Sequence, residues 1–325
     1  MVTERLEQKR RSLPGFEIVV GIVVAAALLN RVVAPYLSGP HLQTWATIFV
    51  ATLLQAMPFL VLGVAMSGAI AAFISADRMQ RLLPRNPVGA VATAGSAGLL
   101  LPGCECGSVP ISGRLIAGGA RPAAALTFML SAPAINPVVL VSTAVAFPGR
   151  PGMVAARFIA SLVTAIVMGL LWLRADQQRI VDRAMQRVQH GASRWWTFAL
   201  TARHDFLQAG GFLVLGAAAA AAIQAFTPRG VLDQLGGIPV VAILGMATLA
   251  IVLSICSEAD AFIAASFTQV SPTAQLTFMV VGPTVDLKLI SMQSGVFGGR
   301  FASRFAPVTA IVAIAMALAV GWWLL

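Results

Sequence analysis

Charged residues are scarce in this sequence. They make up 10% of the 325 residues, whereas 58% are hydrophobic, and soluble domains carry about 25% charged residues. The mean hydropathy is +0.86. These values exclude an ordinary soluble domain. They predict an all-α polytopic membrane protein, because helices satisfy their own backbone hydrogen bonds inside a bilayer.

Features that several other functions require are also missing. The chain has three histidines and three cysteines, and an odd cysteine count gives no disulfide framework. The absence of a Walker or P-loop motif argues against ATP hydrolysis. We therefore predict a protein that is not an enzyme and needs no cofactor. The net charge of +10 is typical of arginine-rich cytoplasmic loops, so we expect a lipid bilayer and no nucleic acid as its surroundings.

The chain contains an internal repeat. Residues 52–73 and 205–226 share the pattern LQA, two residues, FLVLG, and an LTFM block recurs in 126–137 and 276–287 at an offset of 150. The same offset aligns Cys106 with Cys256, Pro133 with Pro283 and Asn136 with Asp286. A cysteine, a proline and a polar position in one register predict a duplicated unit.

Each half is predicted to contain four helical elements. They are 44–74, 88–119, 122–147 and 152–174 in the first half, and 205–226, 238–269, 273–295 and 304–325 in the second. The elements 88–119 and 238–269 have about thirty residues with a polar centre, whereas one crossing needs about 20 apolar residues. We predict that both are re-entrant or broken helical hairpins, whose irregular tips are buried in protein or line a cavity at membrane depth.

The basic residues predict how the halves are oriented. With a cytoplasmic N-terminus and two hairpins that do not cross, the basic segments 75–87, 114–121, 174–204 and 288–304 all face the cytoplasm. Each half then crosses three times, so the halves are inverted, as in secondary transporters. The predicted parts are an N-terminal segment with a first membrane helix (1–43), a first repeat (44–174), a cytoplasmic amphipathic linker (175–204) and a second repeat (205–325). The expected location is the bacterial inner (cytoplasmic) membrane, as a multi-pass protein.

The first hairpin carries the sequence LLPGCECGSVP, with Cys104, Glu105 and Cys106 at its centre. Two cysteines on a tight Gly/Pro turn can direct two sulfurs at one point, and thiolates bind soft metals and metalloids. We therefore predict Cys104 and Cys106 as metal ligands in a substrate site. Glu105 either joins that site or turns toward a backbone donor.

The second hairpin carries the sequence SICSEADAF. Cys256 is predicted to contact substrate, with a weaker contribution than the first pair, because the repeat places Ser254 where the first half has Cys104. Glu258 and Asp260 are predicted to carry protons, because acids inside a membrane often act as proton relays. The alternative is that both carboxylates have a structural role and carry no protons.

Three further polar residues are predicted to contact substrate. Ser131 and Asn136 lie in LTFMLSAPAINP, where the two prolines free backbone carbonyls, and Asp286 is the repeat partner of Asn136. If pseudo-symmetry joins the hairpin tips, Asn136 and Asp286 lie beside them. An alternative is that Asp286 and Lys288 only neutralise one another.

The stretch PGCECGSVPISGRLIAGGARPAAALTFMLSAPAINP resembles the signature of a bacterial predicted-permease family that includes ArsP-type organoarsenical efflux permeases. The matching residues are Cys104, Cys106, Gly107, Pro110, Gly118, Gly119, Pro133, Asn136 and Pro137. The resemblance extends from about residue 45 to the end of the chain. It implies a membrane permease, and for some members it implies cysteine-dependent efflux of trivalent methylated or aromatic arsenicals. Other members are linked to metal homeostasis.

Three functions remain open at this point. The favoured one is a secondary transporter of a thiophilic metal or metalloid, such as a trivalent organoarsenical, with a midplane site at Cys104 and Cys106. The second is a permease for another small solute, or for a divalent metal such as zinc, with structural cysteines. The third is a membrane thiol oxidoreductase, which has the least support because no second Cys pair accompanies Cys104 and Cys106. The expected partners are the small-molecule or ion substrate and either a partner protein or further copies of the chain.

Overall fold

The structure is a computed structural model that describes residues 40–73, 84, 86–100, 104–174, 181–182, 184, 193–226 and 239–325. The predicted first membrane helix and the basic segment 75–83 lie outside the described residues, as does part of the predicted linker.

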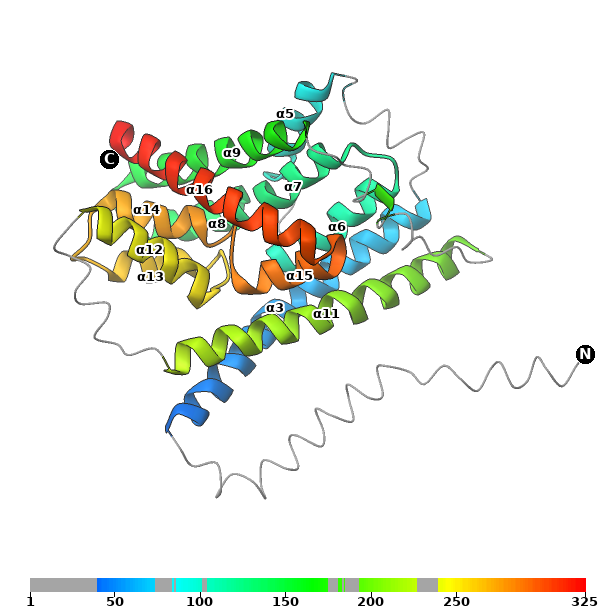
Figure 1. The fold of residues 1–325 in the computed structure, drawn as a ribbon, viewed down its shortest axis with the longest axis horizontal. Helices are drawn as coiled ribbons and strands as arrows, with labels where there is room; N and C mark the ends of the chain where they lie inside the picture. Colours follow the sequence, from blue (N-terminus) through cyan, green and yellow to red (C-terminus); the bar gives the residue numbers. More distant parts are fainter. Residues whose placement is uncertain are drawn as a thin grey trace, which may run out of the picture.

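The described residues form helices and no strand. In chain order (Figure 1) the helices are α3 (Pro40–Phe73), α5 (Pro87–Ala97), α6 (Glu105–Ala117), α7 (Pro122–Ile135), α8 (Pro137–Ala146), α9 (Pro151–Trp172), α11 (Arg194–Phe226), α12 (Pro239–Leu253), α13 (Asp260–Ser266), α14 (Pro272–Val281), α15 (Leu287–Phe297) and α16 (Gly299–Leu324). Five helical stretches are long and apolar enough to cross a membrane: His41–Phe73, Pro122–Ala146, Pro151–Trp172, Arg194–Ala222 and Gly299–Leu324. The predicted all-α polytopic membrane protein is confirmed.

The longest two helices, α3 and α11, pack side by side along one edge of the molecule (Figure 1). They run antiparallel. Near the start of α3, the Trp45 indole donates to the backbone oxygen of Ala218, late in α11. At the other end, the ring of Phe73 meets that of Trp195 edge to face. These helices are the first elements of the two predicted repeats, and their opposite directions are those that inverted repeats require.

Both predicted hairpins are interrupted helices. In the first, α5 ends at Ala97 and α6 begins at Glu105, and the second consists of α12 and α13 with a break at 254–259. In the second break Ser254 has a positive φ of 46°, a conformation that cannot continue a right-handed helix. Its hydroxyl accepts from the backbone N–H of Leu287 at 3.0 Å, so this break is attached to the start of α15.

The elements predicted at 122–147 and 273–295 are also divided in two. The helix α7 ends where Asn136 adopts an extended conformation, because the following proline disfavours a helical residue before it. The Asn136 side chain then accepts from the backbone N–H of Val139 at 2.9 Å and caps α8. Asp286 caps α15 in the same way by accepting from Leu289 N–H. The repeat partners Asn136 and Asp286 thus begin corresponding helices.

Two boundaries differ from the predicted ones. Helix α11 begins at Arg194, inside the predicted linker, because no proline or glycine interrupts residues 194–209. Arg114, counted from the sequence in the basic segment 114–121 that faces the cytoplasm, lies within α6. It is 4% exposed and is paired with Asp205 of α11.

Candidate functional site at the two helix breaks

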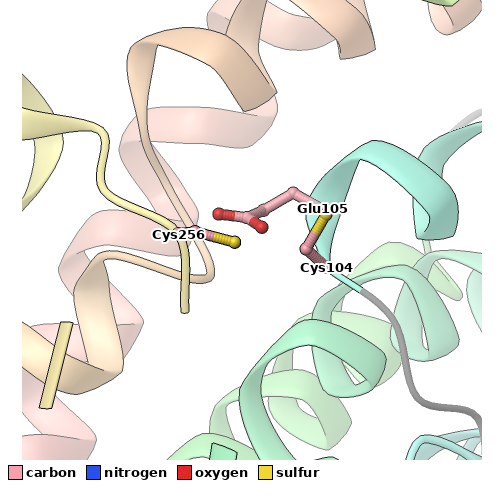
Figure 2. A group of neighbouring side chains, drawn as sticks. All are labelled: Cys104, Glu105 and Cys256. Atoms are coloured by element: carbon pink, nitrogen blue, oxygen red, sulfur yellow. The ribbon is translucent and has the colours of Figure 1, made fainter. Parts of the chain in front are cut away.

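The two breaks meet inside the protein (Figure 2). Cys104 is the residue before α6, Glu105 is its first residue, and Cys256 lies in the second break. The sulfurs of Cys104 and Cys256 and a carboxylate oxygen of Glu105 all lie within 4.8 Å of one another. All three side chains are buried. Residues about 150 positions apart in the sequence therefore supply one cluster of three ligand atoms.

Cys106 lies outside this group of three ligand atoms, although its thiol interacts directly with that of Cys104. Cys106 is the second residue of α6, whereas Cys104 precedes that helix in an extended conformation. Cys106 is buried next to the group and lines a neighbouring cavity. All three cysteines are free thiols.

A close helix crossing places this part of α6. A Cβ on Gly63 of α3 would lie 2.3 Å from the Cα of Gly107, so the two backbones are in direct contact. Only glycine allows such an approach. The contact holds Cys106 against α3, and the residues around it form the apolar core that includes Leu60, Met129 and Met292.

Glu105 faces one cation. Among the described residues neither of its carboxylate oxygens accepts a hydrogen bond, and the Nζ of Lys288 lies 4.0 Å from its Oε1. The same Nζ is 3.5 Å from Oδ2 of Asp286. The sequence leaves open whether Glu105 turns to a backbone donor and whether Asp286 and Lys288 neutralise one another. In the structure Lys288 lies between both carboxylates.

A cavity of about 180 Å³ adjoins this cluster. It lies between the first half of α3 and the second break, and it is lined by Ile48, Ala51, Thr52, Gln55, Ala56, Cys106, Leu253, Ser254, Ile255, Cys256 and Lys288. Two thiols and an ammonium group therefore border a space large enough for a small solute.

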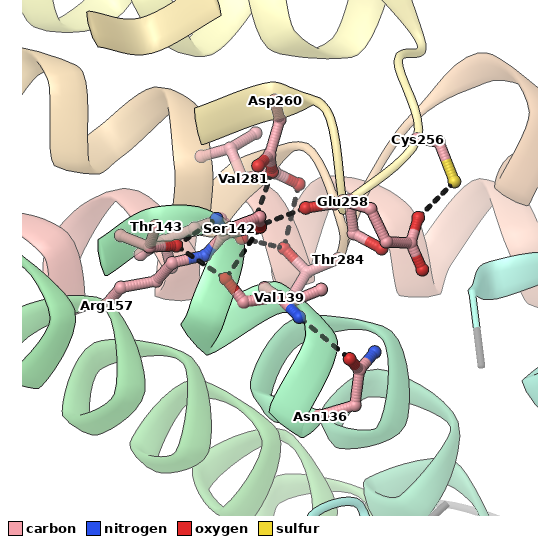
Figure 3. Close-up of polar contacts among 12 residues, drawn as sticks. Asn136, Val139, Ser142, Thr143, Arg157, Cys256, Glu258, Asp260, Val281 and Thr284 are labelled. Carbon is pink, nitrogen blue, oxygen red and sulfur yellow. Dashed lines mark hydrogen bonds and ion pairs between the residues drawn. The ribbon is translucent and has the colours of Figure 1, made fainter. Parts of the chain in front are cut away.

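Glu258 and Asp260 have separate surroundings (Figure 3). The thiol of Cys256 donates to a carboxylate oxygen of part-buried Glu258. Asp260 forms a buried ion pair with Arg157 of α9, with Nη2 and Oδ2 2.7 Å apart. Arg157 also donates to the hydroxyl of Thr143 and to the backbone oxygen of Ser257. One acid thus contacts the thiol cluster, and the other joins the second break to α8 and α9.

Ser131 and Asn136 are buried and make local bonds. The Ser131 hydroxyl donates to the Phe128 carbonyl at 3.2 Å. Asn136 donates to the Ala132 carbonyl at 3.1 Å in addition to capping α8. These bonds support the α7–α8 break, and their predicted contact with substrate stays a prediction.

Arg157 and the Arg114–Asp205 pair are buried polar features that the sequence patterns did not single out. Arg157 lies inside the apolar stretch Pro151–Trp172 and is 0% exposed. The sequence does offer one indication of Arg157, which is a single arginine within an otherwise apolar membrane span. Such a charge must pair with another polar group inside the protein. The partner, Asp260, is 103 residues away, and nothing in the local sequence indicates it.

Comparison with known proteins identifies the family. Residues 41–322 match the model of the family ArsP_1, described as "Predicted permease". This chain belongs to that permease family. It is 37% identical over 278 residues to "UPF0718 protein YcgR" of Bacillus subtilis (strain 168), a match that covers 83% of this chain and 94% of that protein. No solved structure matches it.

A second relative has a more informative name. The chain is 34% identical over 282 residues to the "Putative two-component membrane permease complex subunit" of Streptococcus mutans serotype c (strain ATCC 700610 / UA159), with coverage of 84% of this chain and 94% of that protein. The predicted family is therefore confirmed, and the chain is a multi-pass membrane permease.

Proposed function

We propose that this permease moves a thiophilic metal or metalloid species across the bacterial cytoplasmic membrane. The observation that supports this is the group of two thiols and one carboxylate, contributed by the two helix breaks, with ligand atoms within 4.8 Å of one another. Thiolate ligands favour soft ions over hard ones such as Mg²⁺ or Ca²⁺. Broken helices at the interface of two repeats are where transporters of this architecture bind their cargo.

A site with three protein ligands suits a transported ion, because the ion must be released after it binds. Structural zinc sites are closed by four protein ligands, whereas three ligands keep one position open. Zn(II) can bind to Cys104, Cys256 and Glu105 with a water in the fourth position. A trivalent organoarsenical R–As(OH)₂ can exchange both hydroxyls for the two thiols. Each As–S bond then forms as a thiol proton leaves with a hydroxide as water, so no oxidant is needed.

Glu258 is the acid that we propose for proton coupling. Its carboxylate accepts from the Cys256 thiol, so it is placed to receive the proton that Cys256 gives up when Zn(II) binds; with R–As(OH)₂ that proton leaves in water instead. Asp260 was the other predicted proton carrier. It is bound to Arg157 in a buried ion pair, so we assign it a structural part in holding the second break.

Flux into proteoliposomes tests the function. We expect uptake or exchange of Zn(II) or of a trivalent methylated arsenical, no flux of Mg(II), and faster flux when a pH gradient is imposed. Glu258→Gln should keep binding and lose the effect of the pH gradient. Equal flux of Mg(II) and Zn(II), with no arsenical transport, would contradict a soft-cargo permease.

A further inference from the structure

Lys288 is a buried cation within the site. It is the second residue of α15, it is 3% exposed, and it lines the 180 Å³ cavity together with Cys106 and Cys256. A charged side chain at membrane depth is costly unless it is paired. Its two partners are Glu105 at 4.0 Å and Asp286 at 3.5 Å.

The two partners of Lys288 differ in kind. Glu105 belongs to the group of potential ligands, whereas Asp286 does not. Asp286 is held in place because one of its oxygens caps α15, while among the described residues the other accepts no hydrogen bond. Within the same part of the chain, Glu105 has no hydrogen bond that holds its carboxylate. Lys288 thus lies between a fixed carboxylate and one that is available to a ligand.

We propose that Lys288 is a tethered counter-cation. Its ammonium compensates Glu105 while the site is empty and moves to Asp286 alone when a cationic cargo binds Glu105. This inference rests on the proposed function. A cation bound to Glu105 lies within a few ångströms of the ammonium, and like charges repel strongly in a poorly hydrated interior. The compact charge and flexible stem of lysine suit such a movement.

The movement predicts opposite effects for two substitutions. Lys288→Gln removes the competing cation, so Zn(II) should bind at least tenfold more tightly to the purified protein. Asp286→Asn removes the place to which the ammonium retreats, so Zn(II) should bind at least tenfold more weakly. Asparagine still caps a helix, as Asn136 does at the equivalent position, so α15 keeps its start.

Two control variants separate a movement of Lys288 from a plain effect of net charge on binding. The double variant Asp286→Asn, Lys288→Gln keeps the net charge of the site and should still bind Zn(II) more tightly than the wild-type protein. Lys288→Arg should bind within about threefold of it. Equal affinity in Lys288→Gln, or a shift of the same sign in both single variants, overturns the inference while loss of binding in Cys104→Ser still supports the proposed function. Zn(II) binding that does not depend on Cys104 or Cys256 overturns both.

A second inference comes from a pair of cavities, independently of the cargo. The repeat aligns Thr52, Gln55 and Ala56 of α3 with Asp205, Gln208 and Ala209 of α11. The three residues of α3 line the 180 Å³ cavity. The three residues of α11 line another cavity, of only about 10 Å³. Because α3 and α11 are antiparallel, equivalent positions lie toward opposite ends of the helix pair.

Helices α6 and α15 connect these two cavities. Cys106 and Lys288 line the large one, and Arg114 and Val296 line the small one. Within each helix the two lining residues are eight positions apart, or about 12 Å along a helix. The two cavities therefore lie along the same pair of helices, about two turns apart.

An ion pair lines the small cavity. Nε and Nη2 of Arg114 each donate to one oxygen of Asp205 at 3.0 Å, and the Ser67 hydroxyl donates to the same carboxylate. These bonds join α6 and α3 of the first repeat to α11 of the second. We further propose that the Arg114–Asp205 pair is a gate, and that its opening enlarges the small cavity into a counterpart of the large one.

Cysteine accessibility in detergent-purified protein tests the gate. In Gln208→Cys, the new thiol should react slowly with a bulky charged maleimide, as measured by mass spectrometry of the peptide that contains it. Adding Asp205→Asn should speed this reaction at least tenfold, and the charge exchange Arg114→Asp, Asp205→Arg should slow it again. Asp260→Asn breaks the buried pair with Arg157 and should not change the rate. An unchanged rate in Asp205→Asn, or the same increase in Asp260→Asn, overturns the gate.

Discussion

Replacing either cysteine of the ligand group should reduce the affinity for soft cargo about a hundredfold or more. Serine is close in size to cysteine, but its oxygen is a poor replacement for a soft sulfur donor. A hundredfold loss corresponds to roughly 3 kcal/mol of binding free energy. We expect it for Cys104→Ser and for Cys256→Ser, measured with Zn(II) and with a trivalent arsenical on purified protein.

Cys106→Ser is the matched control for this prediction. It changes a buried cysteine two residues from Cys104 that lies outside the ligand group, so the affinity of this variant for Zn(II) should stay within about fivefold of that of the wild-type protein. The sequence alone predicts the reverse order, with Cys256 less important than Cys106. A large loss in Cys106→Ser with an intact affinity in Cys256→Ser would restore the order predicted from the sequence.

Arg157→Met should strongly destabilise the fold. It leaves Asp260, which is 2% exposed, without its guanidinium partner, and breaking a buried pair in this way costs about 3–5 kcal/mol. The free energy of unfolding in detergent measures the loss. Arg304→Met removes an exposed arginine and should change that free energy by less than about 0.5 kcal/mol.

The double variant Arg157→Met, Asp260→Asn shows whether the cost comes from the orphaned charge. It removes both charges, so it should recover most of the stability that Arg157→Met loses. If Arg157→Met is as stable as the wild-type protein, the pair does not hold the second break to α9.

The sequence predicts the membrane class and the positions of the breaks correctly. Long apolar runs identify the crossing helices, and Gly, Pro and Cys residues at the centres of two elements indicate where those helices stop. The repeat also aligns Asn136 with Asp286, and both cap a helix in the structure. These features are local, or they depend on a register that the sequence itself displays.

The composition of the site was only partly predictable. Register pairs Cys106 with Cys256, and both line the same cavity. The ligand group nevertheless joins Cys256 to Cys104 and Glu105, which no sequence pattern indicates. The partners of Arg157 and Arg114 come from other helices, 103 and 91 residues away. Such contacts arise from packing between helices, which an apolar pattern constrains only weakly because lipid and protein interior are both apolar.

The central claim is that Cys104, Cys256 and Glu105 bind one cargo ion together. X-ray absorption spectroscopy at the zinc edge of the Zn(II)-loaded protein tests it most directly. Joint binding predicts two sulfur ligands at about 2.3 Å and the remaining ligands as oxygen at about 2.0–2.2 Å, with one sulfur left in Cys256→Ser and two in Cys106→Ser. A spectrum without sulfur ligands, or one that keeps both sulfurs in Cys256→Ser, would contradict it.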